Sequence, residues 1–208
     1  MKRMLFPALF LSLAALTIVM LQRQATLAPA DASTDKPTLQ PEARDAKKRP
    51  LELPLIEPRI VVTKSKRQLA LYSGGKVVRI YPVGLGFTPK GDKVRQGDGC
   101  TPEGSFYVCV KNEHSNFYLS LGLSYPNKEH AERGLRDRII TRAQYDEIMS
   151  ALQKRARPLW NTRLGGEIFI HGNGSQRDWT WGCVALDDDN IKELFDAIPK
   201  GSPVLIEP

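Results

Sequence analysis

The sequence predicts an α+β domain, mainly β with added helices, over residues 59–208. Two patterns support this fold class. Short runs rich in β-branched and aromatic residues recur from Arg59 to the end of the chain, whereas only three segments have the apolar spacing of a helix. The 208 residues are 41% hydrophobic, which is enough for one domain with a core and extensions outside it.

Seven segments have the composition of strands: residues 59–64, 68–73, 76–83, 104–111, 117–123, 167–170 and 204–206. The second and third are joined by Ser73-Gly74-Gly75-Lys76, and such a glycine pair is typical of a tight hairpin. In the fourth, Phe106, Val108 and Val110 occupy alternate positions and therefore share one face. The segments together predict a sheet that makes up most of the domain.

Three segments are expected to be helical: residues 128–135, 141–155 and 187–198. Thr141 and Gln144 have the spacing of a capping box at the start of the second helix. The apolar stripe of that helix consists of Tyr145, Ile148, Met149 and Leu152. We interpret the stripe as core rather than as a cofactor site, and the sequence leads us to expect no cofactor.

The first 58 residues differ in character from the rest. Lys2 and Arg3 precede an uncharged apolar run, residues 4–21, which is typical of an export signal and is also long enough to span a bilayer. Residues 1–21 are therefore either a signal sequence or a retained anchor in the membrane. Residues 22–58 contain six prolines among charged residues and predict a disordered linker. We expect a protein of the periplasm or cell envelope, tethered to the inner membrane if the anchor is kept.

Charge and cysteine content limit the classes of partner and site. The formal net charge of +7 suits acidic partners, although it serves solubility equally well. No dense lysine and arginine face with interleaved aromatic residues occurs, so nucleic acid is not an expected partner. The cysteines are Cys100, Cys109 and Cys183, and no Cys-x-x-Cys or His-x-x-x-His spacing is present. We therefore expect no metal site.

An odd number of cysteines leaves at least one thiol free. A strand over residues 104–111 would carry Cys109 away from the loop that holds Cys100. We accordingly expect Cys109 to be buried as a small apolar residue rather than paired with Cys100. His114 and His130 lie in polar stretches and are expected at the surface.

Two motifs, twelve positions apart, point to cysteine chemistry. Ile170-His171-Gly172 places a titratable side chain at the end of an apolar strand, and Trp181-Gly182-Cys183 places a thiol on a tight glycine turn. A thiol becomes a nucleophile as thiolate, and a neighbouring imidazole can take its proton. The pair predicts that Cys183 is a nucleophile and His171 its general base.

These motifs also resemble a known family. Thr101-Pro102-Glu103-Gly104-x-Phe106, then Ile170-His171-Gly172, then Thr180-x-Gly182-Cys183 are similar to the L,D-transpeptidase catalytic domain, or YkuD-like domain. The resemblance covers about residues 59–208. It implies a β-sandwich or barrel-like sheet with peripheral helices, a cysteine acyl-enzyme and peptidoglycan stem peptides as substrate. In that family the acyl group of a donor tetrapeptide passes to an amine of another stem peptide or to a lysine of an outer-membrane lipoprotein.

The resemblance implies a role for several residues of the motifs. Backbone N–H groups of Gly182 and Cys183 would form an oxyanion hole, and the Gly172 region would orient the imidazole of His171, through a backbone carbonyl. We also consider five residues for substrate binding: Trp179, Trp181, Asp178, Arg133 and Arg136. Each of the five has an ordinary structural explanation as well, in loop packing or a solvated surface.

The chain departs from the family pattern in three respects. The second residue after the cysteine is Ala185, where the family commonly has arginine or asparagine, and the interval from His171 to Cys183 is short. Trp179 and Trp181 also lie on either side of Thr180, with Asp178 before them. Residues 123–127 and the helices after them resemble a branch that includes an enzyme cutting the link between lipoprotein and peptidoglycan. The alternative to a transpeptidase is therefore a hydrolase, either an L,D-carboxypeptidase or an amidase that releases a peptidoglycan-linked lipoprotein. A wall-binding module without activity is a third alternative, against which the intact His171 and Cys183 argue.

Overall fold

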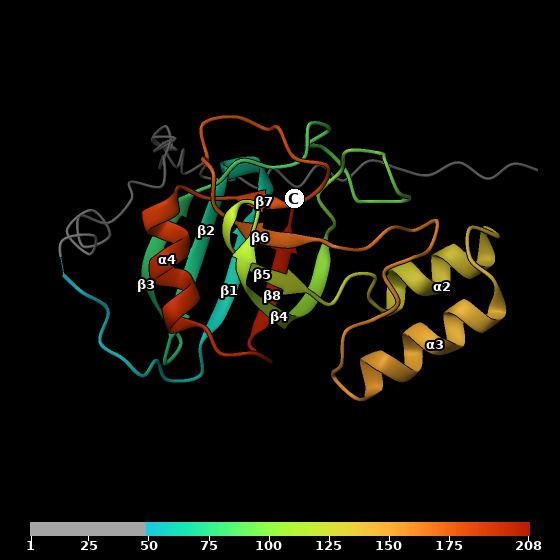
Figure 1. Cartoon of the computed structure of the whole chain (residues 1–208), viewed down its shortest axis with the longest axis horizontal. Coiled ribbons are helices and arrows are strands. Elements are labelled where there is room, and N and C mark those ends of the chain that lie inside the picture. The colour runs from blue at the N-terminus through green and yellow to red at the C-terminus, as the bar shows by residue number, and fades with distance from the viewer. Residues whose placement is uncertain (1–48) are drawn as a thin grey trace, which may run out of the picture. The chain divides into compact units, whose positions relative to one another are not determined.

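The computed structural model describes residues 49–208 (Figure 1). The expected signal or anchor, residues 1–21, and residues 22–48 of the expected linker lie outside this described part. Among residues 49–208, no helix is long and apolar enough to cross a membrane. Leu51 and Leu55, near the end of the expected linker, pack against the main core. Packed structure therefore begins some residues before Arg59.

Eight strands form one mixed sheet in the order β3-β2-β1-β8-β4-β5-β6-β7. The strands are β1 Arg59–Thr63, β2 Gln68–Ser73, β3 Lys76–Pro82, β4 Gly104–Ser115, β5 Tyr118–Leu123, β6 Phe169–His171, β7 Val184–Ala185 and β8 Pro203–Glu207. β1 pairs with β8, and β6 with β7, in parallel, while the other neighbours are antiparallel. The predicted fold class, mainly β with helices, is confirmed. Sequence patterns missed β7, which has only two residues.

Strand β4 connects the two halves of the sheet. Its first residues, from Gly104 to Tyr107, pair with β8, and its later residues, from Val108 to Ser115, pair with β5. The β4–β5 register is interrupted between Val108 and Val110. Such an irregularity bends a strand and increases its local twist. One long strand thus directs β5, β6 and β7 away from the half of the sheet that contains β1, β2 and β3.

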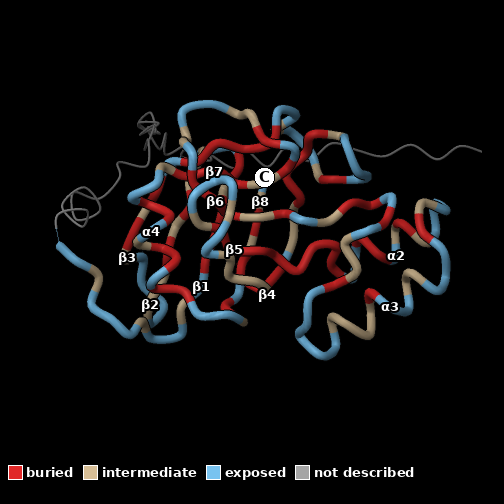
Figure 2. Tube along the Cα trace, in the orientation of Figure 1, coloured by how far each residue is buried: buried red, intermediate tan, exposed pale blue. Residues whose placement is uncertain are grey.

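The described residues form two separate cores. Helix α4, Asp188–Ala197, buries Ile191, Leu194 and Phe195 in the main core against the strands (Figure 2). Helices α2, Lys128–Arg136, and α3, Arg142–Gln153, form a hairpin on the other side of the molecule (Figure 1). The hairpin has a small core of its own: Ala131, Ile140, Ile148 and Leu164. The expected capping box is present, since Thr141 accepts from the Gln144 amide and Gln144 from the Thr141 amide.

Asp92 fixes the helical hairpin to the loop before β4. One carboxylate oxygen lies 3.0 Å from Nε2 of His130 and accepts the Glu103 amide at 2.8 Å, and the other accepts Arg133 at 2.8 Å. Burial would raise the pKa of Asp92, but the hydrogen bonds from His130, the Glu103 amide and Arg133 outweigh it and hold the pKa well below its usual range. The expectation that His130 lies at the surface is wrong, because its ring is enclosed by this cluster and only 1% exposed.

We expect Asp92→Asn to lower the free energy of unfolding by about 1–3 kcal/mol, because the amide keeps the shape but loses charged hydrogen bonds. Denaturant unfolding of the full chain measures the effect. Asp137→Asn is the matched control, since Asp137 pairs with Arg136 at an exposed position and should contribute less than about 1 kcal/mol. Equal losses in the two variants would contradict an anchoring role for Asp92.

Candidate active site

The parallel pairing of β6 with β7 brings the two motifs together. Ile170 is paired with Val184 and His171 with Ala185, so that Cys183 lies beside Phe169. The sulfur of Cys183 accepts a hydrogen bond from the Phe169 amide at 3.4 Å. His171 is two residues beyond Phe169 and therefore on the same face of the sheet. Cys183 and His171 line one cavity from adjacent strands, as diagonal neighbours.

The turn before Cys183 requires glycine. Gly182 has a φ of +128°, and a Cβ there would lie 2.7 Å from the Cys100 carbonyl oxygen. The Thr180 hydroxyl accepts the Gly182 N–H at 3.1 Å and donates to the Cys183 carbonyl at 2.8 Å. The Gly182 N–H, expected in an oxyanion hole, is thus already bonded. No partner is found within residues 49–208 for the Cys183 N–H, which leaves it as the better oxyanion donor.

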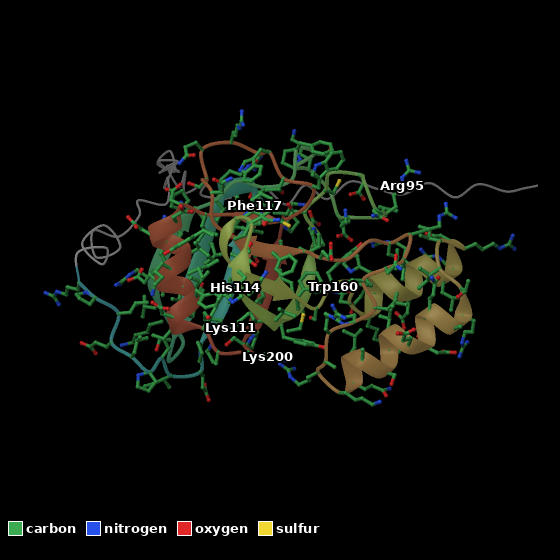
Figure 3. All side chains as sticks on the ribbon, viewed as in Figure 1. Arg95, Lys111, His114, Phe117, Trp160 and Lys200 are labelled. Carbon is green, nitrogen blue, oxygen red and sulfur yellow. The ribbon has the colours of Figure 1, made fainter. Side chains whose placement is uncertain are left out.

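A backbone carbonyl and two aromatic rings fix His171. Its Nδ1 lies 2.7 Å from the Gly172 carbonyl oxygen and donates to it, which leaves Nε2 as the proton acceptor. Phe117 stacks on the imidazole at 4.7 Å between ring centroids, and Trp179 meets it edge-on at 5.6 Å. The Gly172 N–H donates to the Phe117 carbonyl at 3.0 Å. Figure 3 labels Phe117 at this end of the sheet.

Cys183 and His171 are both uncharged near neutral pH. Burial raises the pKa of the Cys183 thiol to about 11, although the Phe169 amide favours the thiolate. Burial also lowers the pKa of His171 below its usual value of about 6.5, against the opposing effect of the Gly172 carbonyl. Near pH 7 the site therefore holds a thiol, whose sulfur lies 3.6 Å from the Glu167 carbonyl oxygen, and a neutral imidazole.

Two cavities meet at Cys183. The histidine-side cavity has a volume of about 360 Å³ and is lined by residues 112 and 114–117, Ser120, Glu167, Phe169, His171 and Cys183. The helix-side cavity has a volume of about 780 Å³ and is lined by Lys93, Gln96, Gly97, Glu147 and Ala151, residues 157–161 and 165–168, Trp181 and Cys183. Only Glu167 and Cys183 line both. The thiol is accessible from two sides, and His171 lines only the smaller cavity.

The five residues considered for substrate binding lie in different surroundings. Trp181 lines the helix-side cavity, is 69% exposed and packs edge-on against Phe87 at 4.8 Å. Trp179 packs on His171 and Phe117 instead, and its indole N–H donates to Gly174. The other three lie at neither cavity described above, since Asp178 is bonded to Arg67 and the Leu85 amide, Arg133 to Asp92, and Arg136 to Asp137.

Sequence patterns did not single out several residues of the site. Phe117 was expected only as the first residue of a strand, yet it covers the imidazole from the turn between β4 and β5. Arg157 and Trp160 line the helix-side cavity from a segment with no regular structure. No local pattern marks them. Ala185 is fully buried and its N–H donates to Gly84, so its side chain does not face either cavity described above.

Comparison with known proteins identifies the family. The model of the L,D-transpeptidase catalytic domain, YkuD, matches residues 57–206. The chain belongs to this family. A "Putative L,D-transpeptidase YqjB" of Bacillus subtilis (strain 168) is 28% identical over 155 residues, which cover 72% of this chain and 71% of that protein. L,D-transpeptidase chemistry on peptidoglycan is therefore the activity of the family to which residues 57–206 belong.

Several solved structures are similar to part of this chain. The L,D-transpeptidase of Xylanimonas cellulosilytica, residues 123–326, is 24% identical with a TM-score of 0.43, covering 79% of this chain and 67% of that one. The helical cell shape determining protein Pgp2 of Campylobacter jejuni is 24% identical with a TM-score of 0.46, covering 72% and 47%. An L,D-transpeptidase of Mycobacterium smegmatis is 12% identical with a TM-score of 0.43, covering 73% and 59%. The chain thus spans about half to three fifths of the last two structures.

We expect alkylation of Cys183 by iodoacetamide to increase with pH around a midpoint below 6.5, because His171 accepts the proton only when it is neutral and its pKa is lowered. In His171→Gln the rate at pH 7 should fall by about 10²- to 10⁴-fold and recover only in the alkaline range where the thiol ionises. Peptide mass spectrometry measures the rate at each cysteine. His114→Gln, which changes an exposed histidine of the same cavity, should keep the wild-type profile.

We expect Phe117→Ala to move that midpoint to higher pH, since loss of the stacked ring exposes the imidazole to water and raises the pKa of His171. Phe117→Leu should move it less, because it keeps part of the apolar cover. Phe87→Ala removes another exposed phenylalanine, one that packs on Trp181, and should leave the midpoint unchanged. An unaltered midpoint in Phe117→Ala would show that the ring does not set the protonation of His171.

Proposed function

We propose that this L,D-transpeptidase-family chain is a peptidoglycan-modifying cysteine acyltransferase that acts on stem peptides through a Cys183 acyl-enzyme. The observation that carries the proposal is the half-buried thiol at the meeting point of two cavities, with His171 lining one of them. A transferase needs one space for the acyl donor and another for the group that leaves or arrives. We further propose that the enzyme works in the periplasm or cell envelope, as the apolar residues 4–21 suggest.

The first half-reaction would form the thioester. Nε2 of His171 takes the proton of the Cys183 thiol as sulfur attacks the carbonyl carbon of the bond before the terminal residue. The Cys183 N–H would stabilise the resulting oxyanion. The carbon–nitrogen bond then breaks, and the leaving amine takes the proton from His171. Cys183 is left as a thioester, and His171 is again neutral.

The second half-reaction would reverse these roles. An acceptor amine gives a proton to His171 and attacks the thioester carbon, after which the carbon–sulfur bond breaks and the thiol recovers the proton. Both the leaving and the arriving nitrogen must therefore approach Nε2 of His171. His171 lines only the histidine-side cavity, so we assign the amines to that cavity and the acyl chain of the donor to the helix-side cavity.

Hydrolysis on the same scaffold is the alternative outcome. Water in place of the acceptor amine would give an L,D-carboxypeptidase, or an amidase that releases a peptidoglycan-linked lipoprotein. The departure at Ala185 does not by itself favour hydrolysis, because this side chain is buried in the sheet and lines neither cavity described above. The histidine-side cavity, at about 360 Å³, has room for more than a water molecule.

The test is to incubate the full chain with purified tetrapeptide muropeptides and an acceptor amine in ¹⁸O-labelled water. Transfer gives a new amide without ¹⁸O, whereas hydrolysis places ¹⁸O in the new carboxylate, and mass spectrometry separates the two. We expect the amide as the main product and an acyl adduct on Cys183. Lipoprotein-linked sacculi in a parallel incubation test for release of the lipoprotein.

Matched cysteine variants decide whether the chemistry belongs to Cys183. Cys183→Ala should lose both products, whereas Cys109→Ala, which alters a thiol buried within the sheet, should retain them. Full activity in Cys183→Ala would overturn the mechanism. If all of the product contained ¹⁸O, the proposed transferase would be wrong and the enzyme would be a hydrolase that forms the same thioester intermediate.

A further inference from the structure

The helix-side cavity contains one cation that is already neutralised. Lys93 donates to Asp98 at 2.8 Å, and its side chain is only 3% exposed. The Asp98 carboxylate also accepts the Val94, Arg95 and Cys100 amides, so it is fixed by its own loop. Lys93 is therefore committed to the loop structure and is a poor candidate for binding an incoming anion.

Arg157 is the contrasting cation of this cavity. Its guanidinium lies 5.0 Å from the centroid of the Trp160 ring, and no hydrogen bond or ion pair to it is found within residues 49–208. A guanidinium over an aromatic face keeps its edge N–H groups free for a planar acceptor. The guanidinium N–H groups of Arg157 are thus available as hydrogen-bond donors at the wall of the cavity that reaches Cys183.

The Trp160 ring beneath Arg157 is held firmly. It meets Phe169 edge-on at 5.4 Å. A Cβ on Gly166 would lie 2.3 Å from the Trp160 Cβ, so that only glycine leaves room for the tryptophan. Figure 3 shows Trp160 between the sheet and the α2–α3 hairpin. Phe169 is also the residue whose amide bonds the Cys183 sulfur. A platform in direct contact with the strand that positions the thiol therefore supports the guanidinium.

We propose that Arg157 is the specificity-determining residue of the helix-side cavity and binds a carboxylate carried by the acyl part of the donor. This inference rests on the proposed function, which places the acyl chain in that cavity. Carboxylate is the fitting chemistry because its two oxygens match the guanidinium fork. The cavity also contains Glu147 and Glu167, so the site is one point of recognition rather than a general basic surface.

Binding to an inactive background tests the subsite without requiring turnover. Cys183→Ala protein, as the full chain, is titrated calorimetrically with two synthetic tetrapeptides that differ only in a side-chain carboxylate or carboxamide on the acyl residue. We expect the carboxylate peptide to bind about 10- to 100-fold more tightly, as charged hydrogen bonds contribute roughly 1.5–3 kcal/mol. Adding Arg157→Gln should remove this preference, and Arg157→Lys should restore part of it.

Arg163→Gln is the matched control, since it removes an exposed arginine of the same segment that lines neither cavity. Equal affinity of the two peptides, no measurable binding, or an equal loss in the Arg163 variant would overturn the carboxylate subsite. Failure of the proposed function has a different signature, because Cys183-intact protein would then form no acyl adduct with either peptide, whatever their affinities.

Discussion

The parallel pairing of β6 with β7 is the constraint on which the rest of the site depends. Each strand contributes only two or three residues, yet their register sets the thiol diagonally across from the imidazole and aims the Phe169 amide at the sulfur. Buried backbone groups must be satisfied, which fixes such a register more firmly than side-chain contacts alone would. The Thr180 hydroxyl and the closely packed Gly182 then shape the turn that leads into β7.

Burial of Cys183 and His171 has a chemical cost. Both groups are held uncharged, so little thiolate is present near pH 7. In the proposed mechanism, transfer of the thiol proton to His171 must therefore accompany the attack by sulfur. The two cavities that meet at Cys183 leave the thiol accessible to a substrate despite this burial.

Most of the fold and the centre of the site could be predicted from sequence, because their signals are local. Three sequence patterns each predict the conformation of the backbone at the same place in the chain. They are the glycine pair at the hairpin, the alternation of apolar residues in β4 and the apolar stripe of α3. The ordered motifs around His171 and Cys183 do the same for the candidate nucleophile and base, which the structure brings to one cavity. β7 was missed since two residues carry no periodicity. Phe117 and Trp160 were missed since their roles arise from contacts with His171 and Phe169 of β6. Arg157 was missed since it lies in a segment with no regular structure.

Charged residues were the least predictable class for the same physical reason. A single arginine or histidine forms no periodic sequence pattern. Whether it anchors the fold, binds a ligand or lies in solvent depends on a partner that is distant in the sequence. His130 and Arg133 meet at Asp92, some forty residues away, whereas Arg157 meets no carboxylate in the described part of the chain. The sequence left the helical arginines between substrate binding and a solvated surface, and placed His130 at the surface. In the structure Arg133 and His130 bond Asp92, whereas Arg136 pairs with Asp137 at an exposed position.

The small second core of the α2–α3 hairpin has a consequence for motion. Four fully or nearly buried residues hold this unit, apart from the much larger cluster under the sheet. Cooperative units with few buried contacts open at lower free energy than the whole domain. The wall that α3 gives to the helix-side cavity is therefore expected to exchange its amide hydrogens earlier than the strands that position Cys183 and His171.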